Sequence, residues 1–305
     1  MNEKLEAVKR ERPNVVGYSA DLLPRIKGGQ EIPGTRCHRI YLSRKLPKDR
    51  LPPDALVPIS IDGVETDCVV IGELFIASLL PIAVAPTPYT ERRDTLIGGI
   101  SIGHGTITAG TLGAFVKRAS QDFMLTNWHV AVGEQGKVGD IIYQPGPYDI
   151  QQVYGEEPSE KYAAGLLESF VFPRFGVDAA LVVPTRAYDR DAFLSPMALS
   201  GIREPAVGMA VLKEGRTTGV TRGIVTDVAA VLSVSYGGGI GVLTFDRLVV
   251  IQGNPYLQGG DSGSVTREDS GAPGEQAAVG LNFAGSLQGY GIASPMSRVA
   301  QELGF

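Results

Sequence analysis

One stretch decides how this chain is organised: Gln258-Gly259-Gly260-Asp261-Ser262-Gly263-Ser264, which lies between two apolar runs late in the sequence. Glycines on both sides of Ser262 keep Cβ atoms out of a tight turn, so the N–H groups of Gly260 and Ser262 can point at one spot beside the hydroxyl. Such paired donors stabilise an oxyanion. A serine hydroxyl also needs a base, because it is a weak nucleophile at neutral pH. The alternative is an ordinary turn in a chain with 39 glycines.

Three histidines can supply the base: His38, His104 and His129. His129 stands near the end of the apolar run 123–130, which is typical of a buried strand. His38 lies in an alternating strand near the N-terminus, where we interpret it as a structural or surface residue. His104 is flanked by glycines in the segment 102–105. We interpret it as a turn histidine, with a role near a cleft as the alternative.

Three aspartates compete to orient that base: Asp140, Asp149 and Asp178. Asp178 lies at the mouth of the strongly apolar run 177–183, where an isolated carboxylate is costly unless it is paired. An imidazole N–H would supply the pairing. We therefore predict that Asp178 is the partner of His129, since it alone opens a buried strand.

Taken together, these segments resemble the chymotrypsin-like (trypsin-fold) serine proteases, which carry their triad in the chain order His, Asp, Ser. The resemblance covers roughly residues 96–305 and rests on four segments. The segment 213–219 is similar to a Gly-Arg-Thr-Thr-Gly segment of bacterial members such as the α-lytic and streptogrisin-like enzymes. The whole chain also resembles a bacterial group of trypsin-like proteins with an extra N-terminal domain. The four segments are Thr126-Asn127-Trp128-His129-Val130, Val177-Asp178-Ala179-Ala180-Leu181, Gly260-Asp261-Ser262-Gly263 and Lys213-Glu214-Gly215-Arg216-Thr217-Thr218-Gly219.

The resemblance implies a serine endopeptidase that works through an acyl-enzyme, a hydrolase. In that mechanism His129 is the base for Ser262, and Asp178 orients His129. The N–H groups of Gly260 and Ser262 form the oxyanion hole. The implied partner is a protein or peptide substrate, and the target can be narrow, including the chain itself. The alternative from another class is a catalytically silent pseudoprotease that binds peptides or docks partners.

The aspartate before the nucleophile needs a cation in this family. The resemblance implies a permanent ion pair between Asp261 and Arg216. The alternative is a new N-terminus freed near Arg93, ahead of Leu96-Ile97-Gly98-Gly99-Ile100. We favour Arg216, which predicts that the intact chain is competent without cleavage at Arg93.

The resemblance also implies where a substrate side chain would bind. The base of the primary pocket is expected at Tyr256 and one wall at Phe283, Ala284 and Gly285. No acid lies at that base, so we expect an uncharged side chain rather than arginine or lysine. The alternative is that Tyr256 packs in the core.

The strand patterns, together with the resemblance, predict a mainly β chain. We expect two antiparallel six-stranded β-barrels of the chymotrypsin-like type with a C-terminal helix, preceded by a small α+β domain. The predicted boundaries are 1–95 for the N-terminal domain and linker, 96–192 for the first barrel, and 193–305 for the second barrel and helix. The N-terminal domain carries no catalytic constellation. Its candidate roles are inhibition, docking of a regulatory partner, or bracing.

Local signals predict three elements. The first ten residues are charged and favour a short helix rather than a secretory signal. Asp62-Gly63 suits the positive φ angles of a type I′ turn, so a β-hairpin is expected around it. A final helix is expected to run to Leu303, with Ser294 as its N-cap and Gly304 marking its end.

Composition restricts the remaining functions. The chain has 305 residues and a net charge of −5, which gives no support to nucleic-acid binding. Its longest apolar run, 74–86, is too short and too rich in proline to span a membrane. The sequence shows no metal cluster, phosphate-binding glycine motif or other cofactor signature. We interpret Cys37 and Cys68 as reduced core thiols, and we predict a cytoplasmic protein.

Overall fold

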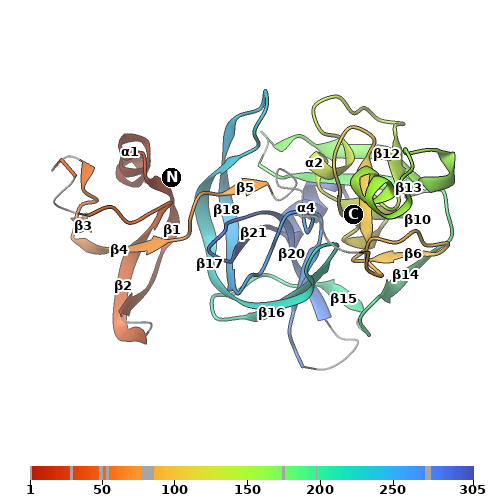
Figure 1. Cartoon of the computed structure of the whole chain (residues 1–305). Helices are drawn as coiled ribbons and strands as arrows, with labels where there is room; N and C mark the ends of the chain where they lie inside the picture. The colour runs from red at the N-terminus through yellow and green to blue at the C-terminus, as the bar shows by residue number, and fades with distance from the viewer. Residues whose placement is uncertain are drawn as a thin grey trace.

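The structure is a computed structural model that describes residues 2–27, 30–47, 51–52, 55–76, 86–173, 176–196, 198–271 and 276–305. Strands dominate it, and they form two large sheets and one pair of short strands (Figure 1). The predicted mainly β class with a C-terminal helix is confirmed. No helix within these described ranges has both the length and the apolar character needed to cross a membrane.

Seven antiparallel strands form the first sheet, in the order β8-β7-β11-β12-β13-β10-β9. No ladder among the described residues joins β8 to β9, so the sheet curls without closing completely. It therefore has seven strands where six were expected. The strands are β7 (Ser101–His104), β8 (Gly110–Thr111), β9 (Ala114–Arg118), β10 (Gln121–Thr126), β11 (Ile141–Tyr143), β12 (Ala163–Val171) and β13 (Ala179–Pro184).

Six antiparallel strands of the second sheet follow the order β16-β19-β20-β21-β18-β17, and β17 pairs again with β16. The ladder thereby returns to its start, as expected for a six-stranded barrel. The strands are β16 (Ala210–Gly215), β17 (Gly219–Ser235), β18 (Val242–Gly253), β19 (Val265–Glu268), β20 (Gln276–Gly285) and β21 (Tyr290–Pro295).

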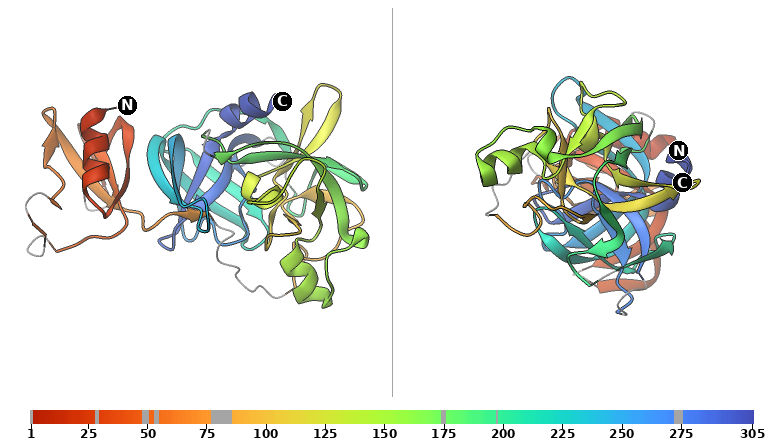
Figure 2. Two further views of the ribbon diagram at one scale, coloured as in Figure 1. Left: turned by 90° about the horizontal axis from the view of Figure 1, so that it is seen from above. Right: turned by 90° about the vertical axis from the view of Figure 1, so that its right-hand side faces the viewer.

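The N-terminal module extends this second sheet. Its strand β1 pairs with β17 through Gly17 opposite Leu232 and Ser19 opposite Ala230. Figure 2 shows the module at one end of the molecule, with the second sheet between it and the first. The boundary at residue 95 stays a prediction. The module consists of α1 (Glu3–Glu11), β1 (Val15–Lys27), β2 (Gln30–Leu42), β3 (Ser60–Ile61) and β4 (Val64–Val70).

Local signals in this module are mostly confirmed. Asp62 and Gly63 have φ angles of 52° and 79°, as a type I′ turn between β3 and β4 requires. Helix α1 forms where it was expected, capped by the side chain of Asn2. Cys37 is buried, but Cys68 is exposed, so only one of the two is a core thiol; the pair forms no disulfide.

Four short strands connect these parts. β6 (Leu96–Gly98) and β14 (Tyr188–Phe193) form a parallel pair, and β15 (Leu199–Ile202) lies parallel to β20. β5 (Phe75–Ile76) pairs with both β17 and β20. Part of the predicted linker, residues 81–85, lies outside the described residues.

The two large sheets share one apolar core. A single cluster joins Met124 and Trp128 of the first half to Leu232 and Phe283 of the second. Close packing of this kind fixes how the ends of strands from the two halves meet. The helices outside the N-terminal module are α2 (Trp128–Ala131), α3 (Pro147–Asp149), η4 (Ile150–Tyr154), η5 (Glu160–Tyr162) and α4 (Met296–Leu303).

Helix α4 covers a second cluster that also spans both halves. Its buried residues include Met296, Val299 and Leu303. It ends at Gly304, whose φ of 76° suits glycine, as expected. The expected N-cap was wrong: Ser294 is held in the ladder of β21, so Pro295 takes the capping position.

The junction between the module and the second sheet yields a first prediction. A Cβ atom at Gly17 would lie 2.1 Å from Val231 O and 2.6 Å from a Leu232 methyl carbon. We expect Gly17→Ala to push β1 away from β17 and to lower the free energy of unfolding by about 1–3 kcal/mol. Chemical denaturation measures the change.

Gly105→Ala is the matched control, because the nearest atom to its Cβ, in Tyr143, lies at an ordinary 3.4 Å. Equal stability of the two variants would contradict the close approach of β1 to β17.

Candidate active site

Strand pairing brings His129 and Asp178 together. Thr126, the last residue of β10, is paired with Ala180 near the start of β13, so the residues that follow β10 meet the residue that precedes β13. His129 Nδ1 donates to Asp178 Oδ2 at 2.5 Å, and His129 N lies 3.2 Å from Oδ1. The amide of Asn127 donates to Asp178 O at 2.7 Å. Both residues of the pair are buried, which strengthens their interaction.

A tyrosine that sequence reasoning missed completes this pair. The hydroxyl of Tyr236 donates to Asp178 Oδ2 at 2.6 Å, and its ring meets the His129 ring edge to face at 6.1 Å. Burial, and then the nearby Asp178 charge, raise the pKa of Tyr236 well above its usual value, so the hydroxyl stays a donor. Tyr236 follows β17 in a glycine-rich turn, where no spacing in the sequence marks it.

Ser262 lies where the two halves meet. Its carbonyl accepts from Thr111 N at 2.8 Å, and a Cβ at the next residue, Gly263, would lie 2.4 Å from Thr126 Oγ1. The Ser262 hydroxyl donates to Phe283 O at 3.2 Å. His129 Nε2 is buried and has no hydrogen-bond partner among the described residues. The serine–histidine hydrogen bond is therefore not formed in this structure.

The two expected oxyanion donors are unengaged. Among the described residues, the N–H groups of Gly260 and Ser262 donate no hydrogen bond, whereas Asp261 N donates to Gln258 O within the loop and Gly263 N donates to Asn282 O of β20. Gly260 has a φ of 95°, and a Cβ there would lie 2.5 Å from Thr217 Oγ1. Only glycine fits this position, so the chemistry of the loop requires it.

The cation beside Asp261 differs from the one expected. Lys213 Nζ lies 3.1 Å from Asp261 Oδ2, and both side chains are fully buried. The carboxylate also accepts from Gln258 N and Thr218 Oγ1, at 3.0 and 2.7 Å. The expected pair of Asp261 with Arg216 is thus wrong, because Lys213 takes the place of Arg216. Burial lowers the pKa of Lys213 although the Asp261 charge opposes the shift.

Arg216 instead joins the two sheets. Its guanidinium makes two contacts with the buried carboxylate of Asp149, including Nε to Oδ2 at 2.9 Å. Ser101 donates to the same carboxylate at 2.5 Å. Asp140 accepts from the ring of His104, Nε2 to Oδ2 at 3.2 Å. Both competing acids therefore have partners other than His129.

The other two histidines take no part in this arrangement. His38 is buried in β2, as a structural residue would be. His104 is the last residue of β7 rather than part of a turn. Within the described residues, no group of three or more His, Cys, Asp or Glu side chains could hold a metal ion.

The residue expected at the base of the substrate pocket is packed in the core. Tyr256 is fully buried in a cluster with Val225 and Ile251, and its hydroxyl lies 2.9 Å from Thr266 Oγ1. A Cβ at Gly291 would lie 2.4 Å from the Tyr256 ring. The ring thus fills the space expected for a pocket, which is the alternative stated for this residue.

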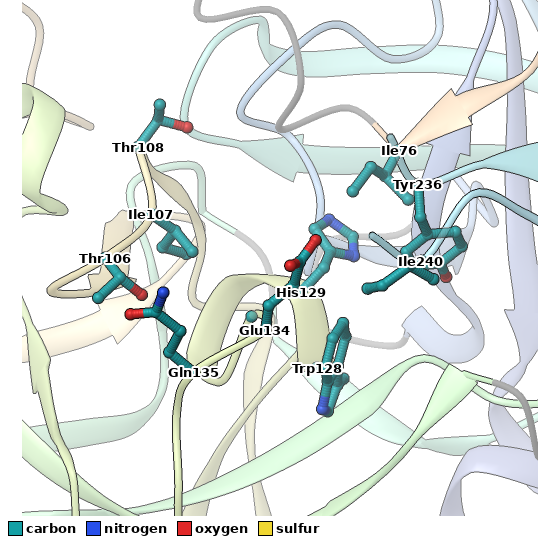
Figure 3. A pocket seen from close by; sticks show the side chains of 11 residues that line it. Ile76, Thr106, Ile107, Thr108, Trp128, His129, Glu134, Gln135, Tyr236 and Ile240 are labelled. Atoms are coloured by element: carbon teal, nitrogen blue, oxygen red, sulfur yellow. The ribbon is translucent and has the colours of Figure 1, made fainter. Parts of the chain in front are cut away.

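The expected pocket wall, Phe283 to Gly285, is covered by another strand. Ala284 is paired with Ile76, and Gly285 with Phe75, so β5 lies along the end of β20. A cavity of about 380 Å³ remains beside His129. Figure 3 shows His129 between one wall formed by Thr106 and its neighbours and another formed by Ile76, Tyr236 and Ile240.

No family model matches the sequence, and no curated protein matches it. Solved structures do. The chain is similar to Thermobifida fusca protease A, with 21% identity and a TM-score of 0.49, over 69% of this chain and 96% of that one. It is similar to Cellulomonas bogoriensis chymotrypsin, with 21% identity and a TM-score of 0.48, over 68% and 95% of the two chains. It is also similar to a glutamic acid-specific serine protease, with 21% identity and a TM-score of 0.49, over 68% of this chain and 98% of that one.

The resemblance to serine proteases seen in the sequence is therefore found among solved structures as well. Because these TM-scores lie below 0.5, the likeness carries no weight for function.

The buried Lys213–Asp261 pair yields a second prediction. Lys213→Met keeps the length of the side chain but leaves a buried carboxylate without its cation. We expect the free energy of unfolding to fall by about 3–5 kcal/mol. Denaturant titration measures it.

Arg222→Met serves as the control, since Arg222 is 68% exposed and pairs with Asp269 at the surface. Loss of this surface pair should lower the free energy of unfolding by less than about 1 kcal/mol. Similar losses in both variants would argue against a special role for the buried pair.

Proposed function

We propose that the chain is a serine endopeptidase in which Ser262, His129 and Asp178 hydrolyse peptide bonds. One observation carries the proposal. The buried Asp178–His129 pair and the serine loop meet at Gly110, where a Cβ atom would lie 2.4 Å from a Val130 methyl carbon and 3.1 Å from Ser262 O. Among the described residues, the N–H groups of Gly260 and Ser262 in that loop are unengaged. Nucleophilic catalysis by serine requires these parts, a base held by an acid and donors for the oxyanion.

The mechanism needs one further contact, between Ser262 Oγ and His129 Nε2, which this structure does not form. Ser262 Oγ attacks the carbonyl carbon of a peptide bond while His129 Nε2 takes its proton. Asp178 holds Nδ1 and stabilises the imidazolium. The N–H groups of Gly260 and Ser262 receive the oxyanion, each worth about 3 kcal/mol. His129 then protonates the leaving amine, and water attacks the acyl-enzyme to release the acid and restore Ser262.

Tyr236 acts on this machinery as a positioning residue. Its hydroxyl reaches the same Asp178 oxygen that receives His129 Nδ1–H. A second donor at this oxygen fixes the carboxylate and therefore the ring plane of His129. The Lys213–Asp261 pair supports the proposal that the intact chain needs no new N-terminus, because a cation of the chain already neutralises Asp261.

A second candidate function is a catalytically silent protein that docks a peptide or a partner. It is favoured by the hydroxyl of Ser262 donating to Phe283 O, with Ser262 itself inaccessible. The N-terminal module would then be the surface for a regulatory partner. A cytoplasmic location and the absence of nucleic-acid and membrane partners stay predictions from the sequence.

Active-site labelling separates the two candidates. For the endopeptidase we expect a fluorophosphonate probe to modify Ser262, because an activated serine attacks phosphorus while a resting hydroxyl does not. Ser262→Ala should lose both labelling and peptide hydrolysis. Mass spectrometry locates the adduct, with Ser264→Ala as the control that keeps it. A chain that stays unlabelled while folded supports the silent candidate.

Tyr236→Phe tests the positioning role. Removing one hydrogen bond to a charged group should lower kcat about tenfold or more, with little change in KM. Steady-state kinetics on a peptide substrate measures both constants.

Tyr41→Phe is the matched control, because Tyr41 donates to another buried carboxylate, Asp227, at 2.7 Å. It should lower stability but leave kcat unchanged. Equal kcat values for Tyr236→Phe and wild type would reject the role.

A further inference from the structure

We propose that strand β5 is an autoinhibitory strand: it occupies the edge of β20 on which a peptide substrate would lie beside Ser262. The proposal rests on the proposed endopeptidase function and goes further, because it names the segment that controls access to the site. A substrate and β5 then compete for one edge of one strand.

The site is closed in this structure. Ser262 is 0% exposed and His129 is 3% exposed. A peptidase must bring a peptide carbonyl within reach of its serine hydroxyl, and a buried hydroxyl leaves no room for the rest of that peptide. With Ser262 as the nucleophile, a segment beside it has to move before a substrate is attacked.

One edge of β20 leads away from the serine loop, residues 258–264. Gly263 N of this loop donates to Asn282 O of β20 at 2.9 Å. The carbonyl of the next residue, Phe283, accepts the hydroxyl of Ser262 at 3.2 Å. The part of β20 that follows Phe283 is therefore the strand edge that adjoins the serine loop.

Strand β5 covers this edge. Because β21 pairs with β20 from residue 280 to residue 285, the serine loop and β5 both lie on the opposite edge. There β5 pairs with the two residues that follow Phe283, with Ile76 opposite Ala284 and Phe75 opposite Gly285. An extended peptide gains affinity by adding its main chain to such an edge. The place directly after the serine loop is thus already taken.

A second strand holds β5 from the other side. Ser235 of β17 is paired with Phe75, and its N–H donates to Leu74 O at 2.9 Å. The residue after Ser235 is Tyr236, which donates to Asp178. The strand β5 is therefore seated between the serine loop's own strand and the residue that positions the acid.

The side chain of Ile76 occupies space beside the proposed base. It is 5% exposed and lines the cavity of about 380 Å³ next to His129, together with Tyr236 and Ile240 (Figure 3). A substrate strand that replaced β5 would place a side chain of its own against these walls. The contact thus blocks a side-chain position as well as a main-chain edge.

The N-terminal module brings β5 to this position. Ile71 N donates to Leu42 O at 2.9 Å, which fixes the residues before β5 to β2. The module is in turn held on β17 by the β1 ladder. A tethered strand competes as an intramolecular ligand, so dilution does not weaken it. Because β5 has only two residues, it can leave the edge while the module stays docked.

Phe75→Pro in the full chain tests the proposal, because proline has no N–H and cannot complete the ladders of β5. Labelling of Ser262 is measured with two probes, a small fluorophosphonate and a phosphonate that carries a tri-alanine peptide. Only the second probe needs the edge of β20. Its labelling rate should rise about tenfold or more, and by a larger factor than the rate of the small probe.

Phe75→Leu is the matched control, because it removes the aromatic ring but keeps the N–H, and it should label like wild type. Equal tri-alanine labelling of Phe75→Pro and wild type, or an equal rise with both probes, overturns the autoinhibition alone. Absence of labelling by both probes in every variant overturns the endopeptidase and this proposal with it.

Steady-state kinetics on a peptide substrate gives a readout that a merely structural role of β5 would not produce. A competing strand reduces the fraction of chains that can bind substrate, and it is absent once substrate has bound. Phe75→Pro should therefore lower KM about tenfold and leave kcat unchanged. An unchanged KM, or a fall in kcat, contradicts competition for the edge.

A reversible lock tests the same contact in the opposite direction. Phe75 and Ser235 are directly paired, and neighbouring strands lie about 4.8 Å apart, a separation that a disulfide can span. The chain with Phe75→Cys and Ser235→Cys should label with the tri-alanine probe about tenfold more slowly when oxidised than when reduced. Each single variant is a control and should not respond. A double variant that forms the disulfide but labels equally in both states overturns the proposal.

Discussion

A carboxylate buried one residue before Ser262 is the constraint on which the C-terminal half depends. Asp261 is fully buried, and an unpaired charge there would be costly. Lys213 neutralises this charge, and main-chain N–H groups of the turn between β16 and β17 donate to the carboxylate, such as Thr217 N at 2.9 Å. These contacts hold the Asp261 side chain in one position and so fix the loop around Ser262. The charge of Asp261 therefore sets the geometry of the neighbouring hydroxyl and N–H groups.

The same turn between β16 and β17 also connects the two sheets. Arg216 lies in this turn and pairs with Asp149, which belongs to the first half of the chain. The buried pair Arg267–Glu214 adds a third charge contact in the region. Buried pairs of this kind add little net stability, but they penalise any other arrangement strongly. We infer that this network holds the halves in register while the apolar core supplies most of the stability.

Much of the candidate site could be predicted because its signals are local. The Asp178–His129 pair follows from one apolar strand that leads into His129 and another that Asp178 precedes, and the Gly260 conformation follows from the glycine itself. The partner of Asp261 could not be predicted, because Lys213 and Arg216 lie three residues apart, both are buried, and only the conformation of the turn decides which one faces Asp261. Tyr236 could not be found either, since its contact with Asp178 is made entirely through tertiary packing.

In the fold, too, features set by local sequence signals could be predicted, and features set by long-range packing could not. Class, hairpin turn and terminal helix follow from periodicity and turn residues, whereas the pairing of β1 with β17 joins segments about two hundred residues apart. Likewise, nothing in the sequence around Phe75 predicts that it pairs with Gly285. Long-range pairings of this kind depend on which surfaces the rest of the chain leaves uncovered.

That pairing of β1 with β17 has a consequence for any shortened form of the chain. Without the N-terminal module, the outer edge of β17 around Val231 would present unsatisfied N–H and C=O groups in an apolar setting. Bare edges invite pairing with a second molecule and lead to aggregation. The module therefore covers this edge of the sheet.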